Sequence, residues 1–313
     1  MSDALFLKVK PEDAGTRLDT YLASAIPDIS RSRAAGLLEK GLVTPAQKPG
    51  YRVAEGDEFC VEIPEAAPME ALPQDIPLDI LYEDSDVIVV NKPKGIVVHP
   101  DNTHRDGTLV NALLFHCRDL SGVGGVMRPG IVHRIDMDTT GSVIACKNDA
   151  AHESIAAQLK VHSIRRVYVA IAIGSFKEKE GVVDAPIGRS EKDRKKMAVS
   201  KPGKGRRAVT HYRVIKEWNG LSLVECRLET GRTHQIRVHM AYLGHPILGD
   251  EVYGRSAVNK KYPAAHGQCL HAMVLGFEHP RTGEYVETVA PLPDYFYEIA
   301  GSDDLFDGEL GTL

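Results

Sequence analysis

Residues 130–141, GIVHRIDMDTTG, bring together side chains that could carry out chemistry. Two carboxylates, Asp136 and Asp138, stand one residue apart and directly follow His133 and Arg134. Two carboxylates at this spacing could bind Mg²⁺, which prefers oxygen ligands. Alternatively, one carboxylate could act as a nucleophile while the other caps a helix or turn. The segment by itself leaves both chemistries open.

A second polar segment, residues 228–250, has the sequence LETGRTHQIRVHMAYLGHPILGD. Arg237 lies between Ile236 and Val238, and in a strand these apolar neighbours would be buried. A guanidinium at such a position needs a carboxylate partner. The histidines of the segment lack the i, i+4 spacing of a zinc-protease pair. We therefore expect structural side chains rather than metal ligands at His234, His239 and His245.

A basic segment, residues 189–207, carries nine Lys or Arg residues against two acidic ones. Such a charge run is most often a solvated loop, but it could also contact the phosphates of a nucleic acid. A second basic group lies near the N-terminus, where Arg31 and Arg33 open an expected helix. Two basic groups on separate parts of the chain suit a long anionic partner.

The bulk properties of the 313-residue chain narrow the class of protein. Hydrophobic residues make up 43% and charged residues 26%, which is typical of a globular protein with a sizeable core. The five cysteines form no C-x-x-C pair, a pattern that favours reduced cytosolic thiols over disulfides or structural zinc. The first residues are too polar for a signal peptide, and no apolar run reaches membrane-spanning length. We expect a cytoplasmic protein with no membrane partner.

Helical spacing predicts a helix over 17–26 and a second helix that ends at Gly41, followed by a turn and strand within 51–63. A proline-rich stretch comes next and has little apolar pattern. We therefore predict a small N-terminal domain over 1–64, a linker over 65–77, a large domain over 78–300 and an acidic tail over 301–313.

In the large domain, two strand-like apolar runs within 78–100 are separated by Asn91–Gly95. Helices are expected at 107–117, with Thr108 as the cap, and at 150–164. Further strands are expected at 141–147, 165–174, 211–218, 221–230 and 284–293. Because strands outnumber helices and do not strictly alternate with them, the pattern predicts an α+β fold with a mixed, largely antiparallel sheet.

The letters DMDTT match the Asp-x-Asp-x-Thr motif of haloacid-dehalogenase-type phosphatases, in which Mg²⁺ bridges the two carboxylates. That motif is expected to end a long apolar strand near the start of its domain, whereas here the charged segment GIVHR precedes it. The downstream acidic pair of such enzymes would have to be Asp303 and Asp304, which stand in the tail. We interpret the match as a coincidence.

GIVHRIDMDTTG also resembles the signature of the Rlu-type pseudouridine synthases, which isomerise uridine in ribosomal and transfer RNA. Three further segments resemble blocks of the same family in the same order: ILYEDSDVIVVNKPKGIVVHP, RRVYVAIAIG and GRTHQIRVHMAYLGHPILGD. The N-terminal unit resembles the small RNA-binding domain shared with a ribosomal small-subunit protein. Residues 41–53, GLVTPAQKPGYRV, depart from that domain because the usual hairpin is shortened.

The resemblance implies an isomerase that needs no cofactor and no metal. It places the catalytic carboxylate at Asp136 and leaves Asp138 a structural or capping role. The carboxylate could attack the sugar or the base, or remove a sugar proton. Arg134 matches the residue that fills the space vacated by the flipped base. Tyr168 matches the tyrosine that packs on that base, and Arg237 matches the basic partner of the carboxylate.

The resemblance further implies an RNA substrate, most of all large-subunit ribosomal RNA, with transfer RNA as the alternative. We expect no DNA partner and a monomer. The second hypothesis is a non-catalytic RNA-binding or ribosome-assembly protein on the same fold, although the joint presence of Asp136, Tyr168 and Arg237 argues against it. Besides Arg134, the residues expected to contact RNA are His133, Thr139, Arg232, His234, Arg31, Arg33, Arg194, Lys195 and Lys196.

Overall fold

The computed structural model describes residues 3–26, 31–63, 71–101, 103–117, 120–121, 129–191, 193, 196–201, 203–302 and 305. The chain divides into two compact units, residues 1–68 and 69–313. Three residues predicted to contact RNA lie outside this description, namely Arg194, Lys195 and the side chain of Arg33. Part of the predicted linker and most of the predicted tail also lie outside it.

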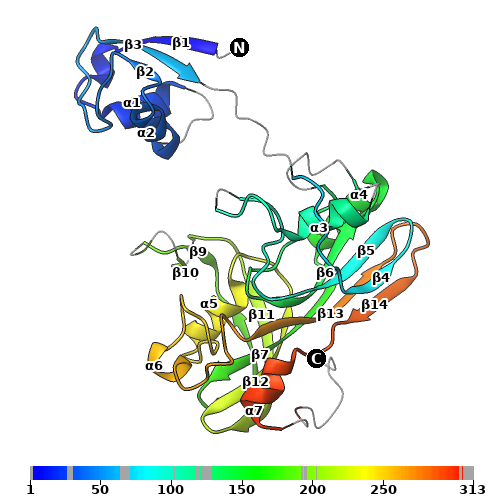
Figure 1. The fold of residues 1–313 in the computed structure, drawn as a ribbon. Coiled ribbons are helices and arrows are strands. Elements are labelled where there is room, and N and C mark those ends of the chain that lie inside the picture. The colour runs from blue at the N-terminus through cyan, green and yellow to red at the C-terminus, as the bar shows by residue number, and fades with distance from the viewer. Residues whose placement is uncertain are drawn as a thin grey trace. The chain divides into compact units, whose positions relative to one another are not determined.

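The first unit combines a small antiparallel sheet with two helices (Figure 1). The strand order is β1-β3-β2, from β1 (Asp3–Lys8), β2 (Val43–Thr44) and β3 (Glu58–Ile63). The helices α1 (Leu18–Ala25) and α2 (Arg31–Glu39) contact each other, and α2 also contacts β3. The two helices and the strand expected in this part of the chain are therefore present.

The second unit is built on one large sheet. Its strands are β4 (Ile80–Glu83), β5 (Val87–Lys92), β6 (Thr140–Cys146), β7 (Arg165–Ile173), β8 (Glu180–Asp184), β11 (Val209–Trp218), β12 (Leu221–Leu228), β13 (Leu270–Glu278) and β14 (Tyr285–Val289). The order is β4-β5-β6-β13-β7-β12-β11-β8, and β14 pairs with β13. Only β6 and β13 pair in parallel among the described strands of this sheet. The predicted mixed, largely antiparallel sheet is confirmed.

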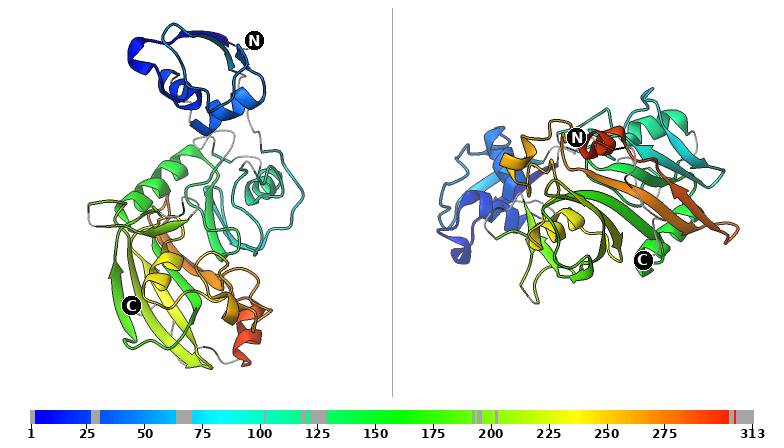
Figure 2. Two further views of the ribbon diagram at one scale, coloured as in Figure 1. Left: turned by 90° about the vertical axis from the view of Figure 1, so that its left-hand side faces the viewer. Right: turned by 90° about the horizontal axis from the view of Figure 1, so that it is seen from below.

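Figure 2 shows the twist of this sheet and the helices around it. These helices are α3 (Leu109–His116), α4 (Asp149–Val161), α5 (Gln235–Tyr242), α6 (Ser256–Asn259) and α7 (Asp294–Ala300). A separate hairpin joins β9 (Ile187–Arg189) to β10 (Met197–Val199). Helix α4 contacts β6 and β13, whereas α5 contacts β10 and β11. No helix in the described part of the chain is long and apolar enough to span a membrane.

The helix cap expected at Thr108 is present. The Thr108 hydroxyl accepts a hydrogen bond from the Asn111 backbone N–H, and the Asn111 side chain accepts one from the Thr108 N–H. This reciprocal capping box satisfies two backbone donors at the start of α3.

The centre of the sheet lies between β6 and β7, whose residues are almost all buried. Strand β13 lies between them and was not predicted. Its sequence, LHAMVLGFE, is buried except for the last residue, so it has no alternation of apolar and polar residues. Gly141 allows β13 to approach β6, because a Cβ at this position (φ 107°) would collide with the Ala272 carbonyl.

Two local predictions are wrong. The apolar run within 78–100 is interrupted at Asp84–Asp86, where the Asp84 carboxylate accepts hydrogen bonds from the backbone N–H groups of Asp86 and Val87. Residues 91–95 do not separate two strands, because Ile96–Val98 is not a strand.

Arg237 lies in α5 and not in a strand. Its apolar neighbours are buried because this helix is enclosed by the large domain.

Candidate active site

Asp136 lies in the segment that leads into β6, and its carboxylate is bound by the Arg237 side chain. Arg237 Nη1 donates a hydrogen bond to Asp136 Oδ2 at 2.8 Å. The same guanidinium donates to both oxygens of Asp250, from Nε at 2.7 Å and from Nη2 at 3.0 Å. Arg237 therefore has two carboxylate partners, Asp136 and Asp250. The sequence had not indicated Asp250.

Arg237, Asp250 and Asp136 stabilise one another's charged forms. Burial lowers the pKa of Arg237, but Asp250 and Asp136 raise it by more, so the guanidinium stays charged. Burial also raises the pKa of Asp250, whereas the hydrogen bonds and charge of Arg237 hold it below its usual range. The Asp250 side chain has no exposed surface, while that of Asp136 is 19% exposed. Asp250 therefore anchors Arg237 from the interior, and Asp136 is the carboxylate that a substrate could reach.

The start of α5 is fixed by the buried side chain of Gln235. Its Oε1 accepts hydrogen bonds from the Thr230 hydroxyl at 2.8 Å and from the Arg232 N–H at 3.0 Å. Its Nε2 donates to the Val209 carbonyl at 2.9 Å. The loop that carries Arg232 and the helix that carries Arg237 are thereby tied to β11.

His234 lies directly before α5 in a left-handed conformation, with φ 58°. Tyr253 accepts a hydrogen bond from the Met197 N–H at 2.9 Å, which leaves its hydroxyl proton free for His234 Nδ1 at 3.0 Å. The His234 proton then resides on Nε2, which lies 3.9 Å from Asp136 Oδ1. Burial holds the pKa of His234 below its usual range, although Asp136 opposes this shift. A neutral His234 thus presents a donor toward the carboxylate.

Tyr168 is 9% exposed and lies on β7. Burial raises the pKa of its hydroxyl; Arg166 opposes this shift and Asp136 adds to it. Tyr168 and Asp136 line two adjoining cavities, of about 60 Å³ and about 570 Å³. The structure therefore brings together the three residues assigned to catalysis: Asp136, Tyr168 and Arg237.

Arg134 and His133, which precede Asp136, have different surroundings. Arg134 is exposed, lines both cavities, and its Nη1 lies 3.3 Å from His99 Nε2. His133 is half-buried, and its Nε2 accepts the Ile144 N–H of β6 at 3.1 Å. Burial lowers the pKa of His133 to about 4. His133 therefore supports the loop as a neutral ring while it lines the larger cavity.

Two further residues expected to contact RNA also hold loops of the site. Thr139 is buried, and its hydroxyl accepts a hydrogen bond from Gln268 Nε2 at 3.2 Å. Arg232 Nε donates to the Arg207 carbonyl at 2.9 Å, and the Arg232 side chain lines both cavities. Thr139 fixes the segment behind Asp136, whereas Arg232 borders the space that a substrate would fill.

Beneath this segment lies Lys92, which has no exposed surface. Its ammonium donates hydrogen bonds of 2.7–2.8 Å to the carbonyls of Pro93, Ile96 and Met137. Burial lowers the pKa of Lys92 to about 7, although Asp138 and Asp136 oppose this shift. The contact with Met137 supports the turn between the two carboxylates. The charge of Asp138 acts on the buried Lys92, and the described hydrogen bonds of Arg237 go to Asp136 and Asp250 instead.

Two further residues predicted to contact RNA, Lys196 and Arg31, lie outside the cavities and make protein contacts. Lys196 Nζ donates to the Val252 carbonyl at 3.1 Å, which anchors the start of β10 beside Tyr253. In the first unit, Arg31 Nε lies 3.1 Å from the buried Asp19 carboxylate, while the Arg31 side chain is 58% exposed. The Arg31 side chain is exposed enough to meet a polyanion, whereas Lys196 is half-buried.

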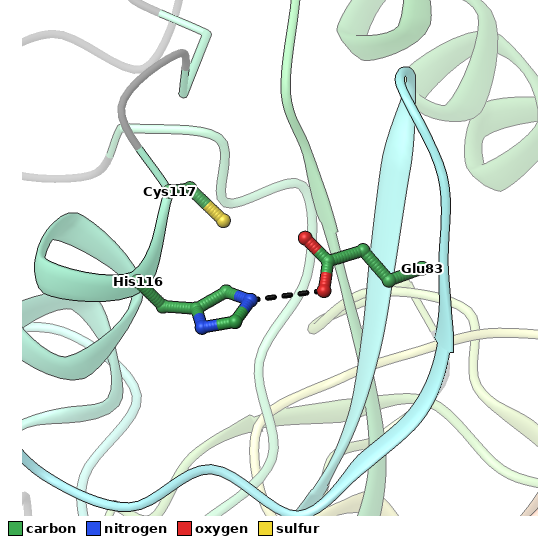
Figure 3. A group of neighbouring side chains, drawn as sticks. All are labelled: Glu83, His116 and Cys117. Carbon is green, nitrogen blue, oxygen red and sulfur yellow. Dashed lines mark hydrogen bonds and ion pairs between the residues drawn. The ribbon is translucent and has the colours of Figure 1, made fainter.

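Away from the cavities, Figure 3 shows Glu83, His116 and Cys117 close together, a group with the donor types of a metal site. Glu83 Oε2 lies 2.9 Å from His116 Nε2, and Glu83 Oε1 accepts a hydrogen bond from Lys147 Nζ at 3.0 Å. The Glu83 carboxylate is therefore already paired with the Lys147 ammonium, whose positive charge would repel a metal ion. A second group, Asp84, Asp86 and His279, is likewise engaged by Tyr82 and Arg281.

Four residues of the site were missed by the sequence analysis: Asp250, Tyr253, Gln235 and Lys92. Asp250 ends the second polar segment and is the one acid downstream of Arg237 within it. The need of Arg237 for a carboxylate could therefore have identified Asp250. Nothing in the local pattern indicates that Lys92 is buried, because lysine usually lies at the surface.

Comparisons with known proteins agree with this arrangement. Residues 86–242 match the family described as RNA pseudouridylate synthase. A relative named uncharacterized RNA pseudouridine synthase YlyB, from Bacillus subtilis (strain 168), is 50% identical over 92% of this chain and 94% of its own. Ribosomal large subunit pseudouridine synthase D of Zymomonas mobilis is 50% identical over 90% of this chain and 92% of its own.

The fold has solved counterparts. The structure of human RNA Pseudouridylate Synthase Domain Containing 1 matches with a TM-score of 0.57 and 26% identity, over 72% of this chain and 86% of the human chain. The family match and the relatives together cover the sheet, the segment around Asp136 and the helix that carries Arg237. The chain belongs to the RNA pseudouridylate synthase family, and it is an enzyme that isomerises uridine to pseudouridine in RNA.

Proposed function

We propose that this enzyme acts on specific uridines of large-subunit ribosomal RNA and uses Asp136 as its catalytic carboxylate. The observation that carries the role of Asp136 is its position. Among the described residues, it is the sole carboxylate that lines either cavity of the site, where it is bound by Arg237 and shares both cavities with Tyr168. The choice of substrate is supported by relatives named ribosomal large subunit pseudouridine synthase D, at 50% identity in Zymomonas mobilis and 43% in Pseudomonas aeruginosa.

In the proposed reaction the target base leaves its stack and enters the cavity beside Asp136. The bond between the sugar and N1 breaks, the uracil turns, and carbon 5 joins the sugar. The proton lost from carbon 5 is matched by one gained at N1, so the isomerisation consumes no co-reactant and needs no cofactor. Asp136 acts on the sugar or the base during cleavage, and Tyr168 packs on the detached ring.

The surrounding residues fit RNA capture. Arg134 fills the space that the base leaves, and its exposed side chain has room to do so. Arg232 and His234 contact the nucleotide inside the cavities. His133 and Thr139 support the loop from behind. The cations of segment 189–207 and of the first unit, including Arg31 and Arg33, contact phosphates outside the site. We place this monomeric enzyme in the cytoplasm.

The test is a direct assay on defined RNA. Purified protein is incubated with transcripts of large-subunit ribosomal RNA and, in parallel, with transfer RNA, and pseudouridines are mapped in each product. We expect isomerisation at specific uridines of the ribosomal transcript only. Modification confined to transfer RNA would overturn the proposed substrate, and full activity of Asp136→Asn would overturn the proposed residue.

A further inference from the structure

Arg166 is a buried cation without an ionic partner in the described part of the chain. Its side chain lines the larger cavity, yet the residue is only 7% exposed. Its Nη2 donates one hydrogen bond, to the Glu229 carbonyl at 3.1 Å, while its Nε is buried and has no partner. Burial also lowers the pKa of Arg166. A buried guanidinium with unused donors is costly unless an anion completes its hydrogen bonds.

The position of Arg166 relates it to the reaction centre. Residues two apart on a strand point to the same face, so Arg166 and Tyr168 of β7 share one face. Gly231 borders the guanidinium, and a Cβ at that position would lie 2.8 Å from Arg166 Nη1. The absence of a side chain at Gly231 therefore leaves space beside the guanidinium, within the cavity that also reaches Asp136.

The rest of the cavity is strongly positive. Besides Arg166, its lining includes Lys160 at the end of α4, Arg232 and Arg134. The sole carboxylate among its described lining residues is Asp136, whose charge Arg237 already balances. A volume of about 570 Å³ is sufficient for a nucleotide together with a neighbouring phosphate.

We propose that Arg166 binds a phosphodiester of the RNA strand directly next to the target uridine. The fork of a guanidinium matches two phosphate oxygens, and the low dielectric of a buried site strengthens such a pair. The contact would hold the backbone while the base lies between Tyr168 and Asp136. This inference rests on the proposed role of Asp136, because it assumes that the base enters this cavity.

The neighbouring residue provides a matched control. Arg165 lies on the opposite face of β7, and its Nη1 is paired with Glu287 Oε2 at 2.9 Å. Arg165→Gln and Arg166→Gln therefore remove the same charge from adjacent positions. The probe is a single-stranded oligoadenylate with one central uridine, and its affinity for the full chain is measured over a range of salt concentrations.

Arg166→Gln should weaken binding by about tenfold, the loss typical of one charge-assisted hydrogen bond. The slope of log affinity against log salt should fall by about 0.7, the value for one phosphate contact on single-stranded RNA. Arg165→Gln should change the affinity by less than about twofold, because Arg165 is paired with Glu287 and does not line the cavity. Equal affinity losses for the two variants would overturn the proposal.

A change on the RNA side tests the same contact without altering the fold. A methylphosphonate linkage next to the uridine removes one phosphate charge. It should weaken binding to the wild-type protein and have a smaller effect on Arg166→Gln, which has already lost the charge that pairs with this phosphate. Equal penalties in both proteins, or no penalty at either flanking linkage, would contradict the proposal. Inorganic phosphate should not restore the affinity of the modified RNA. Whether ribosomal RNA is the substrate does not affect these measurements.

Discussion

Asp250 holds Arg237 by two hydrogen bonds, of 2.7 and 3.0 Å, and so leaves Arg237 Nη1 free to bind Asp136 at 2.8 Å. The backbone N–H groups of Val252 and Tyr253 bind Asp250 Oδ1 in turn. One buried carboxylate therefore orients the arginine and also shapes the loop that carries Tyr253. Asp136, the proposed catalytic carboxylate, is left accessible to substrate.

Asp136→Asn should reduce isomerisation below detection while RNA binding persists. The amide keeps the size and most hydrogen-bonding capacity of the carboxylate but removes the anion that acts on the nucleotide. Single-turnover assays and filter binding measure the two properties separately. Asp138→Asn is the matched control and should keep substantial activity, because Asp138 does not contact Arg237 in the described structure. Activity of Asp136→Asn within tenfold of wild type would contradict the assignment.

Asp250→Asn should lower the free energy of unfolding by about 3 kcal/mol, because the buried guanidinium loses the stronger of its two carboxylate partners. Urea unfolding at neutral pH measures the loss. The control is Asp184→Asn, at an exposed pair in which Asp184 Oδ2 lies 3.9 Å from Arg207. This control should change stability by less than about 1 kcal/mol. Equal losses for the two variants would show that Asp250 has no special structural role.

Tyr253→Phe should slow the chemical step at saturating RNA by about tenfold, with little change in affinity. The substitution keeps the ring, which lies 5.3 Å from Arg237 Cζ, but removes the hydroxyl that binds His234. His234 then has no partner to fix its protonated nitrogen. Tyr242→Phe, at an exposed position, is the control and should behave as wild type. A loss of affinity without a loss of rate would indicate a role in RNA binding instead.

Replacing Arg194, Lys195 and Lys196 with Ala should weaken RNA binding and flatten its salt dependence. If all three contact phosphates, the slope of log affinity against log salt falls by up to about two units. The single-turnover rate at saturating RNA should change little, since Asp136 and Arg237 are intact. An unchanged slope would show that this part of segment 189–207 is a solvated loop. A large loss of rate would mean that the anchor of Lys196 on Val252 shapes the active site.

Stability should fall as the pH is lowered from 6.5 toward 4. His271 is fully buried, and burial lowers its pKa from 6.5 to about 4. Between these values the unfolded chain binds a proton that the native state does not, so the native state loses stability as the pH falls. Urea unfolding over this range should show a smaller decline for His271→Gln than for wild type. The exposed His266→Gln should keep the wild-type decline, and equal declines in all three proteins would contradict the prediction.

The sequence alone was sufficient to identify the family and the segments that meet at the candidate site. Asp136, Arg134, Tyr168 and Arg237 each stand in one of four ordered blocks, and their roles were assigned from those blocks. Strongly patterned elements such as β7 and β12 were also predictable, because their apolar runs are bounded by clear turn signals. The mixed sheet followed from the number and order of the strands.

Only the tertiary structure revealed which distant residues meet. β13 lies between β6 and β7, although it is far from both in sequence and has no alternating pattern of its own. The helical position of Arg237 was equally hidden, as was the buried guanidinium of Arg166, which has no ionic partner among the described residues. Local periodicity reports how one segment faces the core, whereas these features depend on how separate segments pack. Burial then determines which charges must find a partner and which remain available to a substrate.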